Sequence, residues 1–223
     1  MTSGARLTCN YMRIGGVAFE LRSGFEEAVR NLLPRLQQTI ADGQELLAEN
    51  EIFIARARDV AVVSPETAIG ASLTGPMLRG SGVAWDIRKA DPYSGYEKYD
   101  FQIPIGYKGD AYDRFTVRLE EMRQSIKIVE QALDDLPGGP HSTEVPLAFR
   151  PPAGEAYARI ESPRGELGYY LISDGGPSPF RFHIRPPSLI NLSVLKEMTV
   201  GASVADAIIA LGSVDIVVGE IDR

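Results

Sequence analysis

The sequence predicts an α+β protein in which a bundle of long helices is joined to a small antiparallel sheet of about three strands. Apolar residues recur at helical spacing in two long segments of the first 145 residues. From residue 146 onward, short strand-like segments alternate with turn residues. We therefore divide the chain into a helical part, 1–145, and a part 146–223 that holds the sheet, short helices and an extended tail. The two parts are expected to pack as one unit.

The first long helix is expected over about 24–49, after an N-terminal segment 4–22 that ends in a glycine turn. Its apolar residues share one face of a helix: Phe25, Val29, Leu32, Leu36, Ile40 and Leu47. Ser23 has the side chain of a helix N-cap, and Glu26 stands three positions later, as in a capping box.

The segment between the long helices begins with short apolar patches that charged residues separate, over 50–73. Ser64 followed by Pro65 indicates the start of a short helix. The range 75–82 is rich in glycine and proline, which predicts a connection made of turns. From 91 to 109, the mixture of Tyr, Pro and Gly predicts an irregular loop.

The second long helix carries the clearest local pattern and is expected over about 111–136. Its apolar residues alternate at steps of four and three: Phe115, Leu119, Met122, Ile126, Val129 and Leu133. The following segment, 137–140, contains two prolines and two glycines and ends the helix. Two long helices with such narrow apolar stripes favour antiparallel packing.

The last third of the chain predicts strands, then helices, then a tail. The expected strands are 156–160, 166–173 and 180–185, the expected helices are 188–198 and 202–211, and the expected extended tail is 213–223. Ser203 has the side chain of an N-cap for the second of these helices.

Composition excludes several classes of function. The 223 residues are 44% hydrophobic and 24% charged, as in a soluble globular protein, and no apolar run approaches the ~18 residues of a membrane span. A net charge of −7 argues against nucleic acid. The single cysteine, Cys9, cannot form an internal disulfide or hold an iron–sulfur cluster alone. His141 and His183 lack metal-ligand neighbours, so no metal site is expected.

Six segments resemble the large quinone-site subunit of respiratory complex I, which in bacteria is the D subunit of NADH-quinone oxidoreductase. They are 10–17, 73–82, 121–125, 161–170, 173–176 and 219–223, and they occur in the family's order over nearly the whole chain. The resemblance implies a fold like that of nickel–iron hydrogenase large subunits, from which the family descends.

The tail shows how the family departs from hydrogenases, which end in Asp-Pro-Cys-x-x-Cys-x-x-His. In this chain Asp215 takes the Asp position, Val217 and Glu220 take the two Cys positions, and Arg223 takes the His position. Neither Val nor Glu supplies the soft thiolate that a nickel–iron site needs. The resemblance therefore implies a cavity that accommodates quinone in place of the metals.

Within the resemblance, Asp215 and Val217 match positions that line the quinone pocket. A carboxylate there can orient a quinone oxygen or help deliver protons. The alternative is that Asp215 only caps the tail or forms a salt bridge in it. Glu220 and Arg223 are expected to anchor the terminus. No residue of the chain is expected to be catalytic by itself.

Arg6 and Thr8 resemble residues near a [4Fe–4S] cluster that a partner subunit holds. A guanidinium at Arg6 would stabilise the reduced cluster, or it would form an ordinary interface salt bridge. Some relatives have His where this chain has Thr8, which cannot titrate, so a cluster potential that is insensitive to pH is expected. We also expect Arg79 to be a buried structural arginine, and Arg164 and Glu166 to pair locally.

The resemblance implies an electron-transfer subunit of a proton-translocating NADH:quinone oxidoreductase. Electrons would pass from NADH through iron–sulfur clusters of partner subunits, above all the small iron–sulfur subunit, to quinone. The chain itself would bind no cofactor, and it would lie at the cytoplasmic face of a bacterial inner membrane as a peripheral subunit. The family has a further N-terminal half and a helix between 140 and 151, neither of which is expected here. The alternative is therefore a truncated, non-catalytic paralogue or fragment that acts as a structural module.

Overall fold

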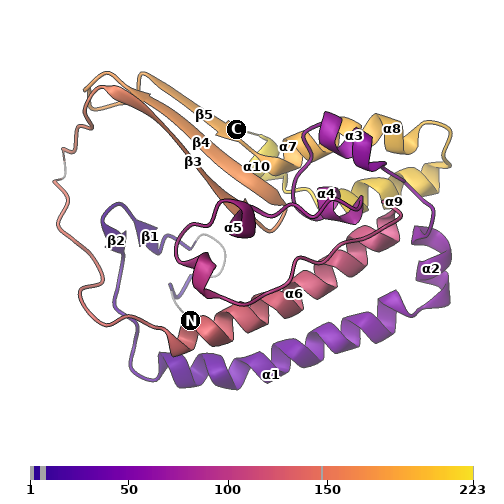
Figure 1. The fold of residues 1–223 in the computed structure, drawn as a ribbon, viewed down its shortest axis with the longest axis horizontal. Helices are drawn as coiled ribbons and strands as arrows, with labels where there is room; N and C mark the ends of the chain where they lie inside the picture. The colour runs from indigo at the N-terminus through magenta and orange to yellow at the C-terminus, as the bar shows by residue number, and fades with distance from the viewer. Residues whose placement is uncertain (1–2, 6–8, 147, 223) are drawn as a thin grey trace.

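A computed structural model describes residues 3–5, 9–146 and 148–222. Figure 1 shows two long helices side by side along one edge of the molecule, and a sheet that rises away from them. The described chain starts with a small hairpin of β1 (Met12–Arg13) and β2 (Gly16–Val17), which the sequence did not predict beyond its glycine turn. The fold class that the sequence predicts, α+β, is confirmed.

The first long helix consists of α1 (Phe25–Gly43), which continues into a π-helical turn, η1 (Gln44–Ala48). Its predicted extent is confirmed, but its predicted cap is wrong. The N-cap position is held by Gly24, whose φ of +79° is left-handed, and no side chain caps the helix. The chain thus enters the helix one residue later than a capping box at Ser23 requires, and Glu26 supplies only an acidic side chain for the first turn.

Helix α6 (Ala111–Asp134) runs antiparallel to α1, as the sequence predicts (Figure 1). Asp110 caps it by accepting a hydrogen bond from the backbone N–H of Asp113 at 2.8 Å. The core between the helices contains Ile40 of the first predicted stripe, Leu119, Ile126 and Leu133 of the second, and Leu33 and Ala48, which lie outside the predicted stripes. Leu36 and Leu47 of the first stripe are 41% and 45% exposed. Two members of the α6 stripe, Met122 and Val129, are instead 47% and 39% exposed.

The segment that connects the long helices contains four short helices and one 3-10 turn. They are α2 (Glu51–Ala57), α3 (Pro65–Gly70), α4 (Pro76–Gly80), α5 (Ile87–Ala90) and η2 (Tyr96–Lys98). Ser64 caps α3 as predicted. The turns predicted over 75–82 are present at both ends of this range, but the short helix α4 between them was not predicted. Because α4 is buried on every side, it has no apolar stripe that a periodicity search could find.

The sheet contains the three antiparallel strands that the sequence predicts: β3 (Gly154–Ser162), β4 (Gly165–Ser173) and β5 (Arg181–Arg185), in that order across the sheet. In Figure 1 the β3–β4 hairpin extends away from the helices at one end and reaches the middle of the molecule at its turn. That turn lies against α4. A Cβ at Gly75 would stand 2.5 Å from the carbonyl oxygen of Arg164 and from the Cα of Gly165. Glycine is therefore required at both contact points.

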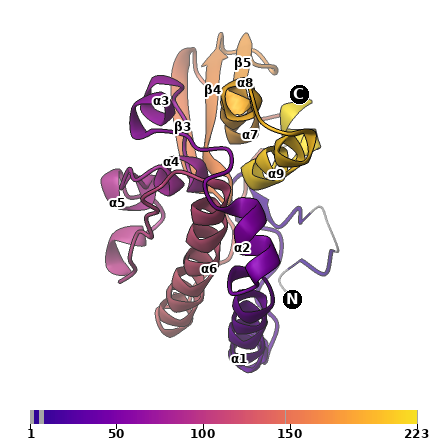
Figure 2. The same ribbon diagram turned by 90° about the vertical axis from the view of Figure 1, so that its right-hand side faces the viewer.

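The C-terminal part packs more helix around the same centre. It holds α7 (Pro187–Asn191), the 3-10 turn η3 (Leu192–Val194), α8 (Leu195–Thr199), α9 (Val204–Val214) and α10 (Val218–Ile221). Ser203 caps α9 as predicted. The prediction of a fully extended tail is wrong, because Val218–Ile221 forms one helical turn too short to show a period. Figure 2 shows α9 above α2 and beside the upper end of α6.

A second apolar core joins the connecting segment to the C-terminal helices. Its buried members are Ala61, Val63, Ala68, Leu73, Met77, Leu78, Val194, Met198, Ala210 and Val214. Buried Asn191 reinforces this junction, since its Nδ2 donates to the carbonyl oxygen of Arg164 at 3.0 Å and its Oδ1 accepts from the backbone N–H of Thr74 at 3.4 Å. The division of the chain at residue 145 stays a prediction.

Across the residues that the structure describes, no helix combines the length and apolarity that crossing a membrane requires.

The core between α1 and α6 allows a direct test of the helix pairing. We expect Ile126→Ala to lower the free energy of unfolding by about 2–4 kcal/mol, because Ile126 is only 7% exposed between the two helices. The matched control is Ile52→Ala, since Ile52 is 76% exposed, and it should change stability by less than about 1 kcal/mol. Urea denaturation measures both variants. Equal losses would contradict the pairing.

Candidate functional site

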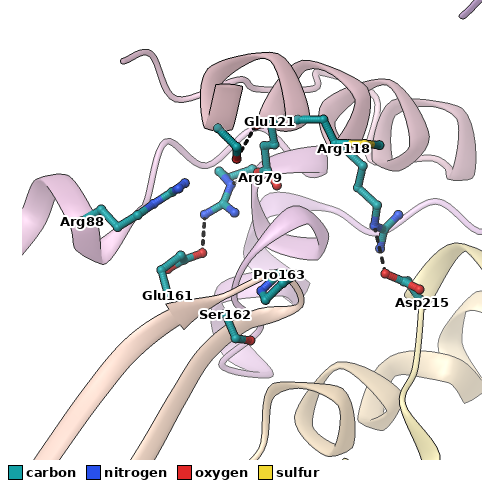
Figure 3. Close-up of a pocket in the computed structure, with 10 residues that line it drawn as sticks. Arg79, Arg88, Arg118, Glu121, Glu161, Ser162, Pro163 and Asp215 are labelled. Carbon is teal, nitrogen blue, oxygen red and sulfur yellow. Dashed lines mark hydrogen bonds and ion pairs between the residues drawn. The ribbon is translucent and has the colours of Figure 1, made fainter. Parts of the chain in front are cut away.

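A cavity of about 440 Å³ lies where α6, α4, α5, the β3–β4 turn and the segment after α9 meet. Figure 3 shows its charged side chains, which come from both sides of the cavity. Its lining consists of Arg79, Arg88, Arg118, Glu121, Met122, Ser125, Glu161, Ser162, Pro163 and Asp215. Six of these ten residues carry charge, so the cavity is a polar site in the middle of the fold.

Arg79 is the centre of the charged network on one side of the cavity. Its guanidinium is 1% exposed. Its Nε donates to Glu121 at 2.5 Å and its Nη1 to Glu161 at 2.8 Å, and Asp86 lies 3.6 Å from the same Nη1. Nη1 also donates to the carbonyl oxygen of Trp85 at 3.0 Å. One side chain on α4 thus ties together α5, α6 and the end of β3.

The pKa values of this network follow from burial and charge together. Burial alone would lower the pKa of Arg79, but the surrounding carboxylates outweigh it and raise that pKa. Burial alone would raise the pKa of Asp86, but hydrogen bonds from Arg88 and the charge of Arg79 hold it below its usual value. Arg88 donates two hydrogen bonds to the carboxylate of Asp86, from Nε at 3.0 Å and from Nη2 at 2.6 Å.

The pKa of Glu161 is shifted in the opposite direction to that of Asp86. Burial raises the pKa of Glu161 above its ordinary value, Arg79 only partly offsets that rise, and the charge of Asp86 adds to it. Two cations, Arg79 and Arg88, face three carboxylates, of Asp86, Glu121 and Glu161. When all five groups are ionised, this network therefore carries one surplus negative charge.

The other side of the cavity has the opposite surplus. Asp215 lies 3.4 Å from Arg164 and 3.9 Å from the Nε of Arg118, so that one carboxylate faces two guanidinium groups. Figure 3 shows Arg118 reaching from α6 toward Asp215. Among the buried side-chain atoms of the described residues, the Nε of Arg118 is the one without a hydrogen-bond partner. Burial lowers the pKa of Arg118, and Asp215 offsets this in part.

Arg114, one helical turn before Arg118, adds to this positive region. It is fully buried, and it donates to the carbonyl oxygens of Gly109 and Ala61 at 2.8 and 2.9 Å and to the hydroxyl of Ser213 at 3.0 Å. Burial, together with the nearby charge of Arg118, lowers the pKa of Arg114 to about 10. The segment after α9 therefore lies beside two arginines, Arg114 and Arg118. Backbone carbonyl oxygens accept hydrogen bonds from some of the N–H groups of these arginines but not from all of them.

Two apolar hollows adjoin the charged cavity along α6. One, of about 320 Å³, lies between α1 and α6 and shares Met122 and Ser125 with the cavity. The other, of about 510 Å³, lies between α2, α6 and α9 and shares Arg118 and Asp215 with it. The three spaces thus form a series in which a charged centre has an apolar hollow on each side.

The sequence analysis singled out three described residues of the tail. Asp215 lines the cavity and adopts a left-handed backbone conformation, with φ of +58°, at the end of α9. Val217 is the N-cap residue of α10 and is 39% exposed, and it is not among the residues that line the charged cavity. Its backbone N–H points to the hydroxyl of Ser188 at 3.5 Å. Glu220 accepts hydrogen bonds from the same hydroxyl and from the backbone N–H of Ser188.

The other three predicted site residues, Arg6, Thr8 and Arg223, lie outside the residues that the structure describes. Within the described ranges, no group of three or more His, Cys, Asp and Glu side chains could hold a metal ion. His141 instead lies 3.4 Å from the carboxylate of Glu20 near the β1–β2 hairpin.

Asp215, a predicted pocket residue, lines the cavity, and Arg79 is buried as predicted. Glu161 and Arg118 also line the cavity but were not predicted as site residues. The prediction that Arg164 pairs with Glu166 is wrong. Arg164 pairs with Asp215, and Glu166 pairs with Arg159 at 3.3 Å, because residues close together at a hairpin turn need not point their side chains the same way. A charged residue next to the Ser162-Pro163 turn was the available signal for Glu161.

Comparison with known proteins gives one consistent result. The chain matches the family model of the respiratory-chain NADH dehydrogenase 49 kDa subunit over residues 1–148 and 144–223. It is 50% identical over 222 residues to the NADH-quinone oxidoreductase D subunit of Desulforamulus reducens. It is 52% identical over 222 residues to the D subunit of Syntrophobacter fumaroxidans. It is 50% identical over 223 residues to the D subunit of Dehalococcoides mccartyi.

These matches cover 99–100% of this chain but only 60–61% of each of those relatives. The chain therefore spans about three-fifths of the length of the curated relatives that it matches.

The Arg79 network predicts a large loss of stability when its central cation is removed. We expect Arg79→Met to lower the free energy of unfolding by about 3–5 kcal/mol, because two buried carboxylates and the half-buried carboxylate of Glu121 would lose their shared cation. The control is Arg56→Met, which breaks a pair with Asp206 in which Arg56 is 44% exposed, and it should cost at most about 1 kcal/mol. A loss below that of the control would contradict the network's structural role. Urea denaturation gives both values.

The raised pKa of Glu161 predicts how stability depends on pH. The folded chain binds more protons at this site than the unfolded chain, so stability is highest when Glu161 is protonated and falls as pH rises above 4.5 through the folded pKa. Each pH unit between the folded and the unfolded pKa of Glu161 changes the free energy of unfolding by about 1.4 kcal/mol. We expect Glu161→Gln to remove this fall, and Glu197→Gln, at an exposed position of α8, to keep it. Urea denaturation at several pH values above 4.5 measures this dependence. If the free energy of unfolding depends on pH in the same way in wild type and Glu161→Gln, the raised pKa does not belong to Glu161.

Proposed function

Because the chain belongs to the family of the respiratory-chain NADH dehydrogenase 49 kDa subunit, we propose that it is a quinone-site subunit of an NADH:quinone oxidoreductase. In this proposal, electrons from NADH pass through iron–sulfur clusters of partner subunits to a quinone bound against this chain. The enzymatic activity belongs to the assembly, and the contribution of this chain is to bind and position the quinone.

The observation that carries the proposal is the series of spaces along α6. A quinone has a polar ring with two carbonyl oxygens and an apolar tail, so it needs hydrogen-bonding groups next to an apolar channel. The charged cavity supplies the first, and the apolar hollow that shares Met122 and Ser125 with it supplies the second. The two kinds of surface that a quinone needs thus lie next to each other.

Asp215 and Arg118 are the groups that we propose to orient the ring. The Nε of Arg118 is buried without a hydrogen-bond partner among the described residues, so a carbonyl oxygen in the cavity would satisfy it. Asp215 holds that guanidinium from the side, 3.9 Å away, and can accept a hydrogen bond from reduced quinone. We propose that Val217, which follows Asp215 closely in the chain, lies at the rim of the pocket rather than in its charged centre.

The same family membership supports a proposed position in the assembly. We propose that Arg6 and Thr8 face a [4Fe–4S] cluster held by the small iron–sulfur subunit, and that Glu220 and Arg223 anchor the tail. A cluster of that kind supplies electrons one at a time. The chain would be peripheral, on the cytoplasmic side of a bacterial inner membrane, and held there by its partner subunits.

A second candidate is a non-catalytic docking module, and one observation favours it. Helix α9 presents an apolar stripe to solvent, with Val204 83%, Ile208 67% and Leu211 39% exposed. Such a stripe fits a surface that a partner covers. A module of this kind would bind its partner subunits and would not bind quinone.

Quinone binding can be measured on the chain itself through its only tryptophan, Trp85, whose backbone carbonyl oxygen accepts a hydrogen bond from Arg79 beside the cavity. We expect a short-tailed benzoquinone to quench Trp85 fluorescence in a saturable manner. Asp215→Asn should weaken binding about tenfold, because Arg118 and Arg164 lose the charge that holds them in place.

The matched control is Asp174→Asn, at an exposed turn between β4 and β5, which should bind as wild type does. Saturable quenching that Asp215→Asn weakens supports the quinone-site function. No quenching, together with co-purification of the chain with other subunits, would support the docking module instead.

A further inference from the structure

We propose that Glu161 is a proton donor of the cavity: it holds a proton as a carboxylic acid, donates a hydrogen bond to a carbonyl oxygen of the bound quinone, and gives that proton up when the quinone is reduced. This inference rests on the proposed function. It assigns a chemical role to a residue that the quinone-positioning groups, Asp215 and Arg118, do not fill.

The position of Glu161 fits this role. It is the next-to-last residue of β3, so the hairpin turn that enters the middle of the molecule carries it into the cavity (Figure 3). Its side chain is 4% exposed, and its Oε1 accepts a hydrogen bond from Arg79 at 2.8 Å. Within the described part of the chain, no group donates to its Oε2. That oxygen is thus the one available to carry a proton toward a ligand in the cavity.

Two hydrogen bonds hold Glu161 in place. Its backbone N–H donates to the hydroxyl of Tyr93 at 2.8 Å, and its Oε1 accepts from Arg79 at 2.8 Å. A proton on Oε2 would therefore point in a fixed direction, which is what a hydrogen-bond donor to a planar ring needs.

The charges around the cavity show why the proton resides on Glu161 rather than on a neighbouring acid. The facing groups are Arg79 on α4, Asp86 and Arg88 at α5, Glu121 on α6 and the Tyr93 hydroxyl from the loop after α5. Asp86 accepts from both the side chain and the backbone N–H of Arg88, so it stays ionised.

Glu121 receives the Nε of Arg79 at 2.5 Å and keeps 15% of its side chain exposed to water. Glu161 shares the Nη1 of Arg79 with the backbone carbonyl oxygen of Trp85 and with Asp86. The side chain of Glu161 is also more deeply buried than that of Glu121. Protonation of Glu161 therefore removes the surplus negative charge of the network at a lower free-energy cost than protonation of Asp86 or Glu121.

The chemical step balances as follows. A one-electron donor outside this chain, such as an iron–sulfur cluster of a partner subunit, delivers two electrons to the quinone in succession and is reduced again between the two transfers. The O–H bond of the Glu161 carboxyl breaks, and an O–H bond forms on one quinone oxygen. The second proton comes from solvent: a water molecule gives a proton to the other oxygen, and the hydroxide that remains takes up a proton from bulk solvent. Glu161 is left as a carboxylate beside Arg79, and it takes up a proton again from solvent after the quinol leaves.

The test is the pH dependence of quinone binding, measured by Trp85 quenching from about pH 4 to about pH 8 with a short-tailed benzoquinone. In wild type we expect affinity to fall about tenfold as Glu161 ionises, because the carbonyl oxygen then meets a carboxylate in place of a donor. Glu161→Gln keeps an N–H donor but cannot ionise, so its affinity should stay level over the same range. Glu197→Gln should follow wild type.

Carbon-13 NMR of the glutamate carboxyl groups in the wild-type chain provides a second measurement that needs no variant to fold. One resonance should titrate at higher pH than the exposed glutamates, and its midpoint should shift further upward when the benzoquinone is added.

The possible results distinguish the proton-donor role of Glu161 from the quinone-site function of the chain. A wild-type affinity that does not change with pH, or a fall that persists in Glu161→Gln, overturns the proton-donor role while leaving quinone binding intact. Glutamate resonances that all titrate together overturn it as well. Absence of saturable quenching at every pH removes the proposed quinone-site function, and the role of Glu161 with it.

Discussion

The structure depends on one buried cation. Arg79, on a helix of a single turn, is 1% exposed and lies within ion-pair distance of three carboxylates from three other elements. A guanidinium can serve all of them because its donors form a rigid, planar fork, which the flexible ammonium group of lysine lacks. Buried charge is tolerated here only because each partner is present. The relative positions of α4, α5, α6 and the β3–β4 turn therefore follow from the geometry of one side chain.

The elements with a local period could be predicted from the sequence. The positions of α1, α6 and the three strands were correct because a helix with one buried face, or a strand bounded by turn residues, repeats its pattern within a few residues. Helix α4 was missed because it is buried on all sides, and α10 because a single turn has no period. The cap of α1 was misassigned because Ser23 has a suitable side chain, while the backbone of Gly24 decides where the helix begins.

The site was less predictable than the fold. The burial of Arg79 could be expected from its glycine-rich surroundings, but its partners Glu121 and Glu161 lie 42 and 82 positions away. No local pattern connects residues at such separations. Asp215 was found through resemblance to a tail motif, and the two arginines that face it come from α6 and from the hairpin turn. The opposite charge surpluses on the two sides of the cavity appear only when these distant segments are placed together.

The order of the elements along the chain has a consequence for how the cavity is built. Asp215 sits between the end of α9 and the turn that Glu220 fastens to Ser188, so this wall is held at both ends. The ribosome makes the polypeptide from its N-terminus, and domains begin to fold while synthesis continues. The long helices and the Arg79 network can therefore assemble during translation, whereas the wall that carries Asp215 is added after every other lining residue has been synthesised. A nascent chain accordingly has the framework of the site before it has a closed one.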